Sequence, residues 1–229
     1  MGKPIDPKVG DSNNSSEIGS LFPSHIIELI QLNYCDLLEV IFQLEELNVE
    51  ESHMAPVLDQ LRELNLFHLS KLTHIWKKGP ERIMGFGNLR LLIVFGCNSL
   101  TYLFSPSIAK LLVMLETINV GYCKKIEEIL ARVGEEEEEQ DVLLHKVNSI
   151  SLKGLPNLKF FCNEANALEW PSLKQIKVID CPSFSRFIPS KLITPKLEGV
   201  YKGDLKGVEM CHWMGDLNAA IEHIFKGKV

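Results

Sequence analysis

The chain has little that would suit a membrane protein or a secreted one. Its 229 residues contain no run of about 18 consecutive apolar residues, so a transmembrane helix is not expected. Residues 1–20 contain no apolar core of the kind that secretory signals carry. Cysteine occurs six times but never as a C-x-x-C pair, which is the usual spacing for zinc or redox chemistry. We therefore expect a cytoplasmic protein with reduced thiols.

Signals for catalysis and for nucleic-acid binding are also missing. The chain has no H-E-x-x-H and no G-x-S-x-G motif. Cys211 and His212 are adjacent, but sequence neighbours rarely form a catalytic dyad. The net charge of −6 matches one acidic run at residues 135–141, and no basic stripe is present for phosphates. We expect no enzyme activity, no cofactor, no metal and no nucleic-acid partner.

The chain does have a recurring frame of apolar residues, L-x-x-L-x-L-x-x-(C/L/S). Seven frames begin at Ile27, Leu44, Leu61, Leu89, Leu115, Val147 and Leu173. Alternation of apolar and polar residues within a frame is typical of a short strand with one buried face. No single frame can bury its own leucines, so neighbouring frames must stack. The pattern predicts an α/β fold, a curved leucine-rich-repeat solenoid whose parallel strands line the concave face.

The segments between frames predict irregular loops and short helices on the convex face. The frames start 17, 17, 28, 26, 32 and 26 residues apart, which predicts about seven repeats with very little outside the first two. Ser105 and Pro106 predict the start of one short helix, with Ser105 as its cap. Trp76 and Trp170 are expected to fill the core between outer segments.

The composition predicts a leader followed by one repeat domain. Residues 1–20 are poor in apolar side chains, which favours disorder. The expected boundaries are a leucine-rich-repeat domain at 21–229, an acidic loop insertion at 130–142 and a C-terminal cap at 194–229. Within the cap we expect a partial strand around Leu197 to Tyr201, and then a short helix whose N-cap is Asp216 or Asn218.

Four cysteines share the last position of a frame, where the chain turns away from the sheet. They are Cys35, Cys97, Cys123 and Cys181. A small, weakly hydrogen-bonding side chain suits that position. Because successive frames should hold these thiols apart, we expect them to be reduced and structural.

Side chains that lie between the buried strand leucines should face the inner curve. The predicted concave protein-contact residues are Tyr34, Phe67, His68, Ile93, Phe95, Tyr122, Lys153, Lys177 and Ile179. Exposed aromatic groups favour a contact site, and early glutamates opposite late lysines would orient a partner. Scattered surface aromatics are also ordinary, and a strand can turn a residue inward, so both interpretations remain open.

Several segments together resemble one family. They are LTHIWKKG, FGNLRLLIVFGCNSLTYLFSPSIAKLLVMLETINVGYCKKIEEIL, LKGLPNLKFFC, WPSLKQIKVIDCPSF and WMGDLNAAI. The chain is similar to the C-terminal leucine-rich-repeat region of plant intracellular immune receptors of the coiled-coil, nucleotide-binding type. The resemblance implies a role in plant defence, through sensing a pathogen effector or a guarded host protein. It also implies autoinhibitory contact with a nucleotide-binding domain, here in trans.

The family's phosphate-binding loop and coiled coil are not found in this chain, so nucleotide switching is not implied. If Met1 is the true start, we expect a detached sensing module or a non-functional truncated receptor fragment. A ubiquitin-ligase substrate adaptor is another alternative, although residues 1–20 could not form its docking helix. A secreted inhibitor-type repeat protein is a third, weakened by the missing signal.

Overall fold

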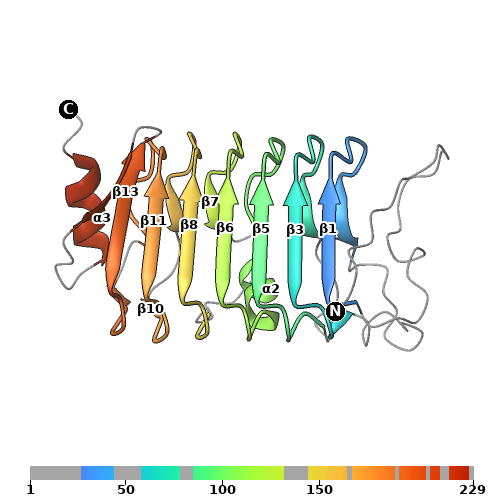
Figure 1. The fold of residues 1–229 in the computed structure, drawn as a ribbon, viewed down its shortest axis with the longest axis horizontal. Helices are drawn as coiled ribbons and strands as arrows, with labels where there is room; N and C mark the ends of the chain where they lie inside the picture. Colours follow the sequence, from blue (N-terminus) through green and yellow to red (C-terminus); the bar gives the residue numbers. More distant parts are fainter. Residues whose placement is uncertain are drawn as a thin grey trace.

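The fold is a single row of stacked chain turns, seen here in a computed structural model (Figure 1). The structure describes residues 27–43, 58–77, 85–131, 144–163, 167–188, 191–204, 207–211 and 217–226. The expected leader at 1–20 and most of the acidic insertion at 130–142 lie outside these residues. The early glutamates at 45–51 lie outside them too.

One eight-stranded sheet forms the front of the solenoid. Seven strands run in parallel in chain order, β1 (Leu29–Asn33), β3 (Glu63–Phe67), β5 (Leu91–Phe95), β6 (Thr117–Gly121), β8 (Ser149–Lys153), β11 (Gln175–Ile179) and β13 (Gly199–Asp204). The last strand, β14 (Gly207–Cys211), pairs antiparallel with β13. The parallel order follows from stacking one strand of each turn on the same strand of the next.

The alternating apolar residues of the frames form the inner face of this front sheet. In register, Leu64 pairs with Leu92 and Leu66 pairs with Val94, and all four are fully buried. Both rows continue through β6, β8 and β11, and the first extends to Val200 of β13, whereas the second ends at Val178, whose partner is Lys202. Burying a leucine completely contributes roughly 1.5–3 kcal/mol, so these rows supply much of the stacking energy. The prediction of a leucine-rich-repeat solenoid is confirmed.

The front sheet has no strand between β1 and β3, where the frame that begins at Leu44 would predict one. Leu29 pairs directly with Glu63, which leaves no place for another strand between β1 and β3. Residues 44–57 lie outside the described part of the chain. The expectation of two minimal repeats is therefore wrong, because that first turn takes 34 residues from Leu29 to Glu63. The seventh parallel strand is instead β13, close to the partial strand expected near Leu197.

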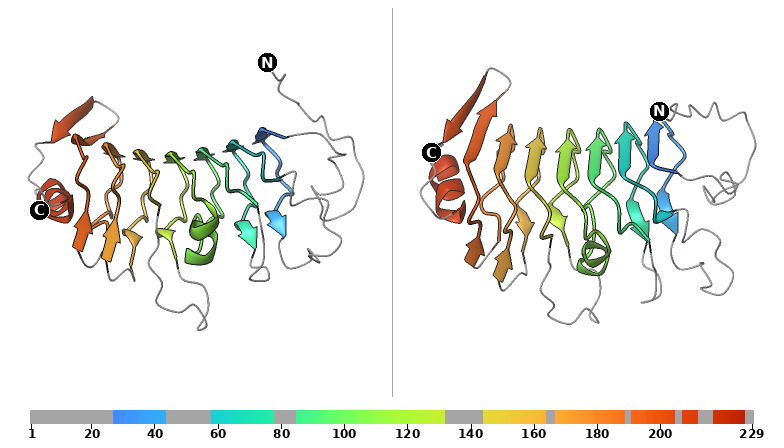
Figure 2. Two further views of the ribbon diagram at one scale, coloured as in Figure 1. Left: turned by 90° about the horizontal axis from the view of Figure 1, so that it is seen from below. Right: turned by 60° about the horizontal axis from the view of Figure 1, so that its bottom comes forward.

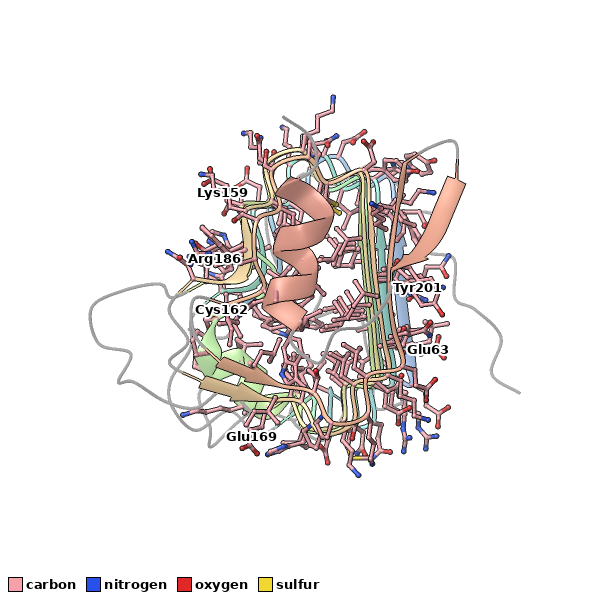
Figure 3. All side chains as sticks on the ribbon, turned by 90° about the vertical axis from the view of Figure 1, so that its left-hand side faces the viewer. Glu63, Lys159, Cys162, Glu169, Arg186 and Tyr201 are labelled. Carbon is pink, nitrogen blue, oxygen red and sulfur yellow. The ribbon has the colours of Figure 1, made fainter. Side chains whose placement is uncertain are left out.

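The back of the solenoid is more regular than expected. Three short parallel pairs lie there, β2 (Val40–Gln43) with β4 (His74–Lys77), β7 (Glu128–Leu130) with β9 (Phe160–Cys162), and β10 (Ala167–Glu169) with β12 (Lys191–Ile193). Single bridges from Phe104 to Leu130 and from Phe160 to Arg186 extend them. Each turn thus stacks on its neighbours at the front and at the back, as the end-on view in Figure 3 makes clear.

Two helices complete the described fold. The short helix α2 (Pro106–Leu111) begins where the sequence predicts, and the hydroxyl of its N-cap Ser105 accepts a hydrogen bond from the Ile108 N–H. The C-terminal helix α3 (Leu217–Lys226) lies against the end of the sheet beyond β13 (Figure 1). Its buried Leu217, Ala220 and Ile221 cover the last turn, as a capping element must.

Asn218 is the second residue of α3 and does not cap it, so that alternative is wrong. Its side chain instead binds the preceding turn. The Oδ1 atom accepts from the N–H groups of Phe187 and Ile188 at 3.1 and 3.4 Å, and Nδ2 donates to the Ile188 carbonyl at 3.0 Å. These three bonds fix the cap to the solenoid.

The two tryptophans expected in the core are buried there. Trp76 is 5% exposed and Trp170 is 1% exposed. Trp170 packs edge-on against Phe161 and Phe187, whose rings stack at 5.5 Å. Aromatic groups thus fill part of the space between the front and back strands.

Candidate protein-contact surface

The backbone turns sharply at one position of each repeat, directly after the front strand. Six consecutive turns have positive φ there, at Tyr34, His68, Gly96, Tyr122, Gly154 and Asp180, with values from 53° to 70°. A left-handed conformation is costly for residues other than glycine, so the stacked turns must impose it. At the positions that are not glycine, this left-handed conformation directs the side chain along the edge of the front sheet.

Aromatic side chains meet along this edge, and we call the set the aromatic strip. Its members are Tyr34, Phe67, His68, Phe95 and Tyr122. Tyr34 and His68 stack with their ring centroids 4.9 Å apart. Phe67 lies 6.2 Å from Phe95, which lies 6.0 Å from Tyr122. Five of the residues predicted from sequence as contact residues are therefore brought together by the strands β1, β3, β5 and β6.

Glycines in the following repeat provide the floor on which three of these rings lie. A Cβ atom on Gly96 would come within 2.5 Å of the His68 ring, and one on Gly121 within 2.7 Å of Phe95. At Gly154 it would come within 2.7 Å of the Tyr122 ring. Any other residue would have to displace the ring, so glycine at these positions lets each aromatic group lie flat on its neighbour. The strip is thereby held in a defined conformation.

Exposure differs strongly among the predicted contact residues. Tyr34 and Tyr122 are 70% and 43% exposed, and His68 is exposed as well. Phe67, Ile93 and Phe95 are half-buried, so each ring or side chain keeps one side in contact with solvent. Ile179 is only 9% exposed, which differs from the expectation that it faces solvent. It lies at the end of β11, beside Lys153 of β8 in the register.

The two predicted contact lysines lie beside tyrosine rings. The Lys153 Nζ atom is 5.4 Å from the centroid of Tyr122, and Lys177 Nζ is 5.8 Å from that of Tyr201. An ammonium group over an aromatic face is attracted by the ring, by about 0.5–1 kcal/mol at exposed sites. Lys153 is thereby continuous with the aromatic strip, whereas Lys177 and Tyr201 form a second pair nearer the C-terminal end.

The four repeat cysteines are free thiols at the ends of the frames. Each donates a weak hydrogen bond to the carbonyl two residues earlier, from Cys35 to Asn33, Cys97 to Phe95, Cys123 to Gly121 and Cys181 to Ile179. This shared geometry tightens the turn after each strand.

The thiols are not all held apart, however, and that expectation is wrong for Cys97 and Cys123. Each follows its strand by two residues, and the strands β5 and β6 pair in register at Phe95 and Gly121. The two thiols are near enough for Cys97 to change the pKa of Cys123. The adjacent Cys97 thiol and burial raise the pKa of Cys123 well above its usual range. Burial also raises the pKa of Cys181, to about 11, against the opposing effect of the Leu155 N–H. Burial raises the pKa of Cys35 in the same way.

Side chains also link successive repeats at the turns, a feature that the frame did not reveal. The bonds run from Ser70 Oγ to Asp36 Oδ1, Ser99 Oγ to the Ser70 carbonyl, Asn157 Nδ2 to the Lys124 carbonyl and Ser183 Oγ to the Pro156 carbonyl, at 2.6–2.9 Å. Ser and Asn at turns commonly satisfy nearby backbone groups, so their recurrence after each frame was the available signal.

Comparisons with known proteins agree with this architecture. The family model "Plant disease resistance protein RPS2-like, leucine-rich repeats" matches residues 15–124 and 115–200. The chain belongs to this family of plant disease-resistance leucine-rich repeats. It is also similar to the "Probable disease resistance protein At4g27220" of Arabidopsis thaliana, with 36% identity over 110 residues. That match covers 46% of this chain and 12% of the relative, so the chain spans a small part of that protein's length.

No solved structure matches the chain. Among the described residues, no helix has both the length and the apolar character needed to cross a membrane.

Proposed function

We propose that this leucine-rich-repeat module takes part in plant defence by binding another protein through the aromatic strip. The observation that carries the proposal is that the strip crosses β1, β3, β5 and β6 as two adjoining groups of rings in contact. Tyr34 contacts His68 at 4.9 Å, and Phe95 contacts Phe67 at 6.2 Å and Tyr122 at 6.0 Å. The two groups adjoin because Phe67 and His68 are neighbours in sequence. Exposed aromatic groups gathered in this way favour a protein-contact site.

The rigidity of the strip supports the same function. His68, Phe95 and Tyr122 rest on glycines of the next repeat, and Tyr34 stacks on His68 with the two ring planes 8° apart. Ordering a mobile side chain on binding costs about 0.5–1.5 kcal/mol, and side chains that are already ordered avoid much of that cost. A surface of this kind is preorganised for a partner.

The membership in a disease-resistance family supports three partner classes. These are a pathogen effector, a guarded host protein that an effector has modified, and the nucleotide-binding domain of a related receptor bound in trans. The third would make this module an autoinhibitory element. We place it in the cytoplasm, and the buried free thiols Cys97, Cys123 and Cys181 are in keeping with that reducing compartment.

Co-precipitation with the nucleotide-binding domain of a related plant receptor tests the proposal. Phe95→Glu on the front should abolish binding, because it places a carboxylate among aromatic rings. Phe160→Glu is the matched control, since Phe160 is also a half-buried strand phenylalanine but lies on the back. Circular dichroism establishes that both variants fold. A folded Phe95→Glu chain that keeps full binding would rule out the aromatic strip, and failure to bind any related receptor domain would argue against regulation in trans.

A further inference from the structure

The front face carries few charges, and they are unevenly placed. Its outward side chains are the first, third and fifth residues of each parallel strand in the common register. Within these rows the charged groups are Glu63 on β3, Lys153 on β8 and Lys177 on β11. Figure 3 shows Glu63 and Tyr201 on the front, opposite Lys159 and Arg186 on the back.

Two pairs of charges that flank the front strands neutralise each other, whereas the two lysines have no such partner. Arg90 and Glu116 form an ion pair at 2.7 Å, and Arg62 lies 3.8 Å from Glu28. Lys153 and Lys177 make no ion pair within the described residues and contact tyrosine rings instead. The exposed Asp180, just after β11, is the nearest carboxylate in sequence to Lys177. This end of the face thus offers two cations without dedicated partners.

Resting on the protein-recognition function proposed above, we propose the chemistry of the bound partner. The aromatic strip and the two lysines bind an extended partner segment that carries an apolar or aromatic residue, with carboxylates two and four residues away from it on the same side in sequence. The apolar side chain lies against Phe95 and Tyr122. The two carboxylates lie at Lys153 and Lys177. Either chain direction satisfies this arrangement, because only the order of the side chains along the surface matters.

The spacing follows from strand geometry. The strands β5, β6, β8 and β11 are consecutive neighbours, and neighbouring strands lie about 4.8 Å apart. Phe95 and Lys177 are therefore separated by three strand spacings, about 14 Å, across the sheet and by two residues, about 7 Å, along the strands. An extended chain advances about 3.3 Å per residue and presents alternate side chains to one face. The first residue of such a segment then lies over β5 and the third lies between β6 and β8. The fifth lies near β11.

The surroundings of this path suit the main chain of such a segment. Asn119 and Ser151 lie side by side in the central outward row and are partly exposed, so an amide and a hydroxyl face the segment. Beyond β11, the hairpin of β13 and β14 rises from the front face and bounds it at the C-terminal end (Figure 2). Tyr201 on β13 holds Lys177 at the foot of this wall. The acidic part of the partner therefore lies between β8 and the hairpin.

A selection experiment tests the proposal with the whole chain. Random linear peptides displayed on phage are selected on the immobilised protein and on the double variant Lys153→Glu, Lys177→Glu. The control double variant is Lys110→Glu, Lys196→Glu, which reverses two exposed lysines outside the outward rows of the front sheet. Fluorescence anisotropy then measures the affinity of the enriched peptides for all three proteins.

The wild-type protein and the control should enrich peptides that contain an aromatic or aliphatic residue and acidic residues two and four positions away from it. Reversing the two lysines should weaken binding of those peptides by at least about tenfold and select basic residues in place of the acids. Two results would overturn this proposal and leave the protein-recognition function standing. One is enriched peptides whose binding depends on Phe95 but that lack acidic residues. The other is enriched peptides whose affinity is unchanged when the two lysines are reversed. Self-association of the chain that the reversal abolishes would also overturn it, because the occupant would then be a second copy. Failure to enrich any peptide would overturn it too, and the receptor-domain test with Phe95→Glu separately decides the recognition function.

Discussion

The contact between Tyr122 and Gly154 predicts a measurable steric coupling between neighbouring repeats. Gly154 has φ of 60°, and a Cβ atom there would lie 2.7 Å from Cδ1 of Tyr122. A non-glycine residue in the left-handed conformation costs roughly 1–2 kcal/mol, and displacing a packed ring costs about 1–3 kcal/mol more. Gly154→Ala should therefore lower the free energy of unfolding by about 2–5 kcal/mol.

A double-mutant cycle separates the two contributions. In a Tyr122→Ala background the ring is absent, so Gly154→Ala should cost only the backbone part, about 1–2 kcal/mol. Urea unfolding followed by circular dichroism and by tryptophan fluorescence measures both values, and coincident transitions verify cooperativity. Gly207→Ala is the control, because nothing lies within 4 Å of its added Cβ. The same cost for Gly154→Ala in both backgrounds would refute the stacked arrangement of Tyr122.

Three further predictions concern the stack itself. Leu66→Ala should lower the free energy of unfolding by about 2–5 kcal/mol in urea titrations, because Leu66 is fully buried between neighbouring repeats. Asn218→Ala should raise amide hydrogen exchange at Phe187 and Ile188, because those N–H groups lose their acceptor. The folded chain keeps the Cys181 proton up to a pKa of about 11, while the unfolded chain releases it near the ordinary value of 9.0. Stability should therefore fall as pH rises from about 9 to about 11, and Cys181→Ala should reduce that slope in parallel urea titrations.

The strands of the front sheet could be predicted because their cause is local. A strand with one buried face needs apolar residues at alternate positions, and Leu64 and Leu66 or Ile176 and Val178 meet that need in the sequence itself. The start of α2 at Pro106 was equally local, since the capping hydroxyl and the proline adjoin it.

The wrong predictions concern features that depend on the number of residues in each turn of the solenoid and on the pairing between turns. The frame at Leu44 has suitable apolar spacing, yet successive front strands pair at intervals of 24–34 residues, because each turn also crosses the back. Back strands such as Glu128–Leu130 are too short for periodicity to reveal. The neighbouring thiols of Cys97 and Cys123 depend on register between strands, which no single frame contains.

The candidate surface was predictable in its members but not in its arrangement. Outward aromatic positions follow from alternation, which is why Phe67 and Phe95 could be named from sequence. The ring contacts within the aromatic strip depend on the positive φ at His68 and Tyr122 and on the glycines beneath the rings. Ile179 illustrates the converse, since its position in the frame suggested exposure and tertiary packing buried it.

Site-specific photo-crosslinking tests the central claim, that the front edge of the sheet is the docking surface, most directly. A benzoylphenylalanine at position 122 replaces a tyrosine of the aromatic strip, and the same group at position 102 replaces the partly exposed Tyr102 near His74 on the back. Illumination in the presence of a bound receptor domain should give an adduct from position 122 and none from position 102. Adducts from position 102 alone would contradict the account.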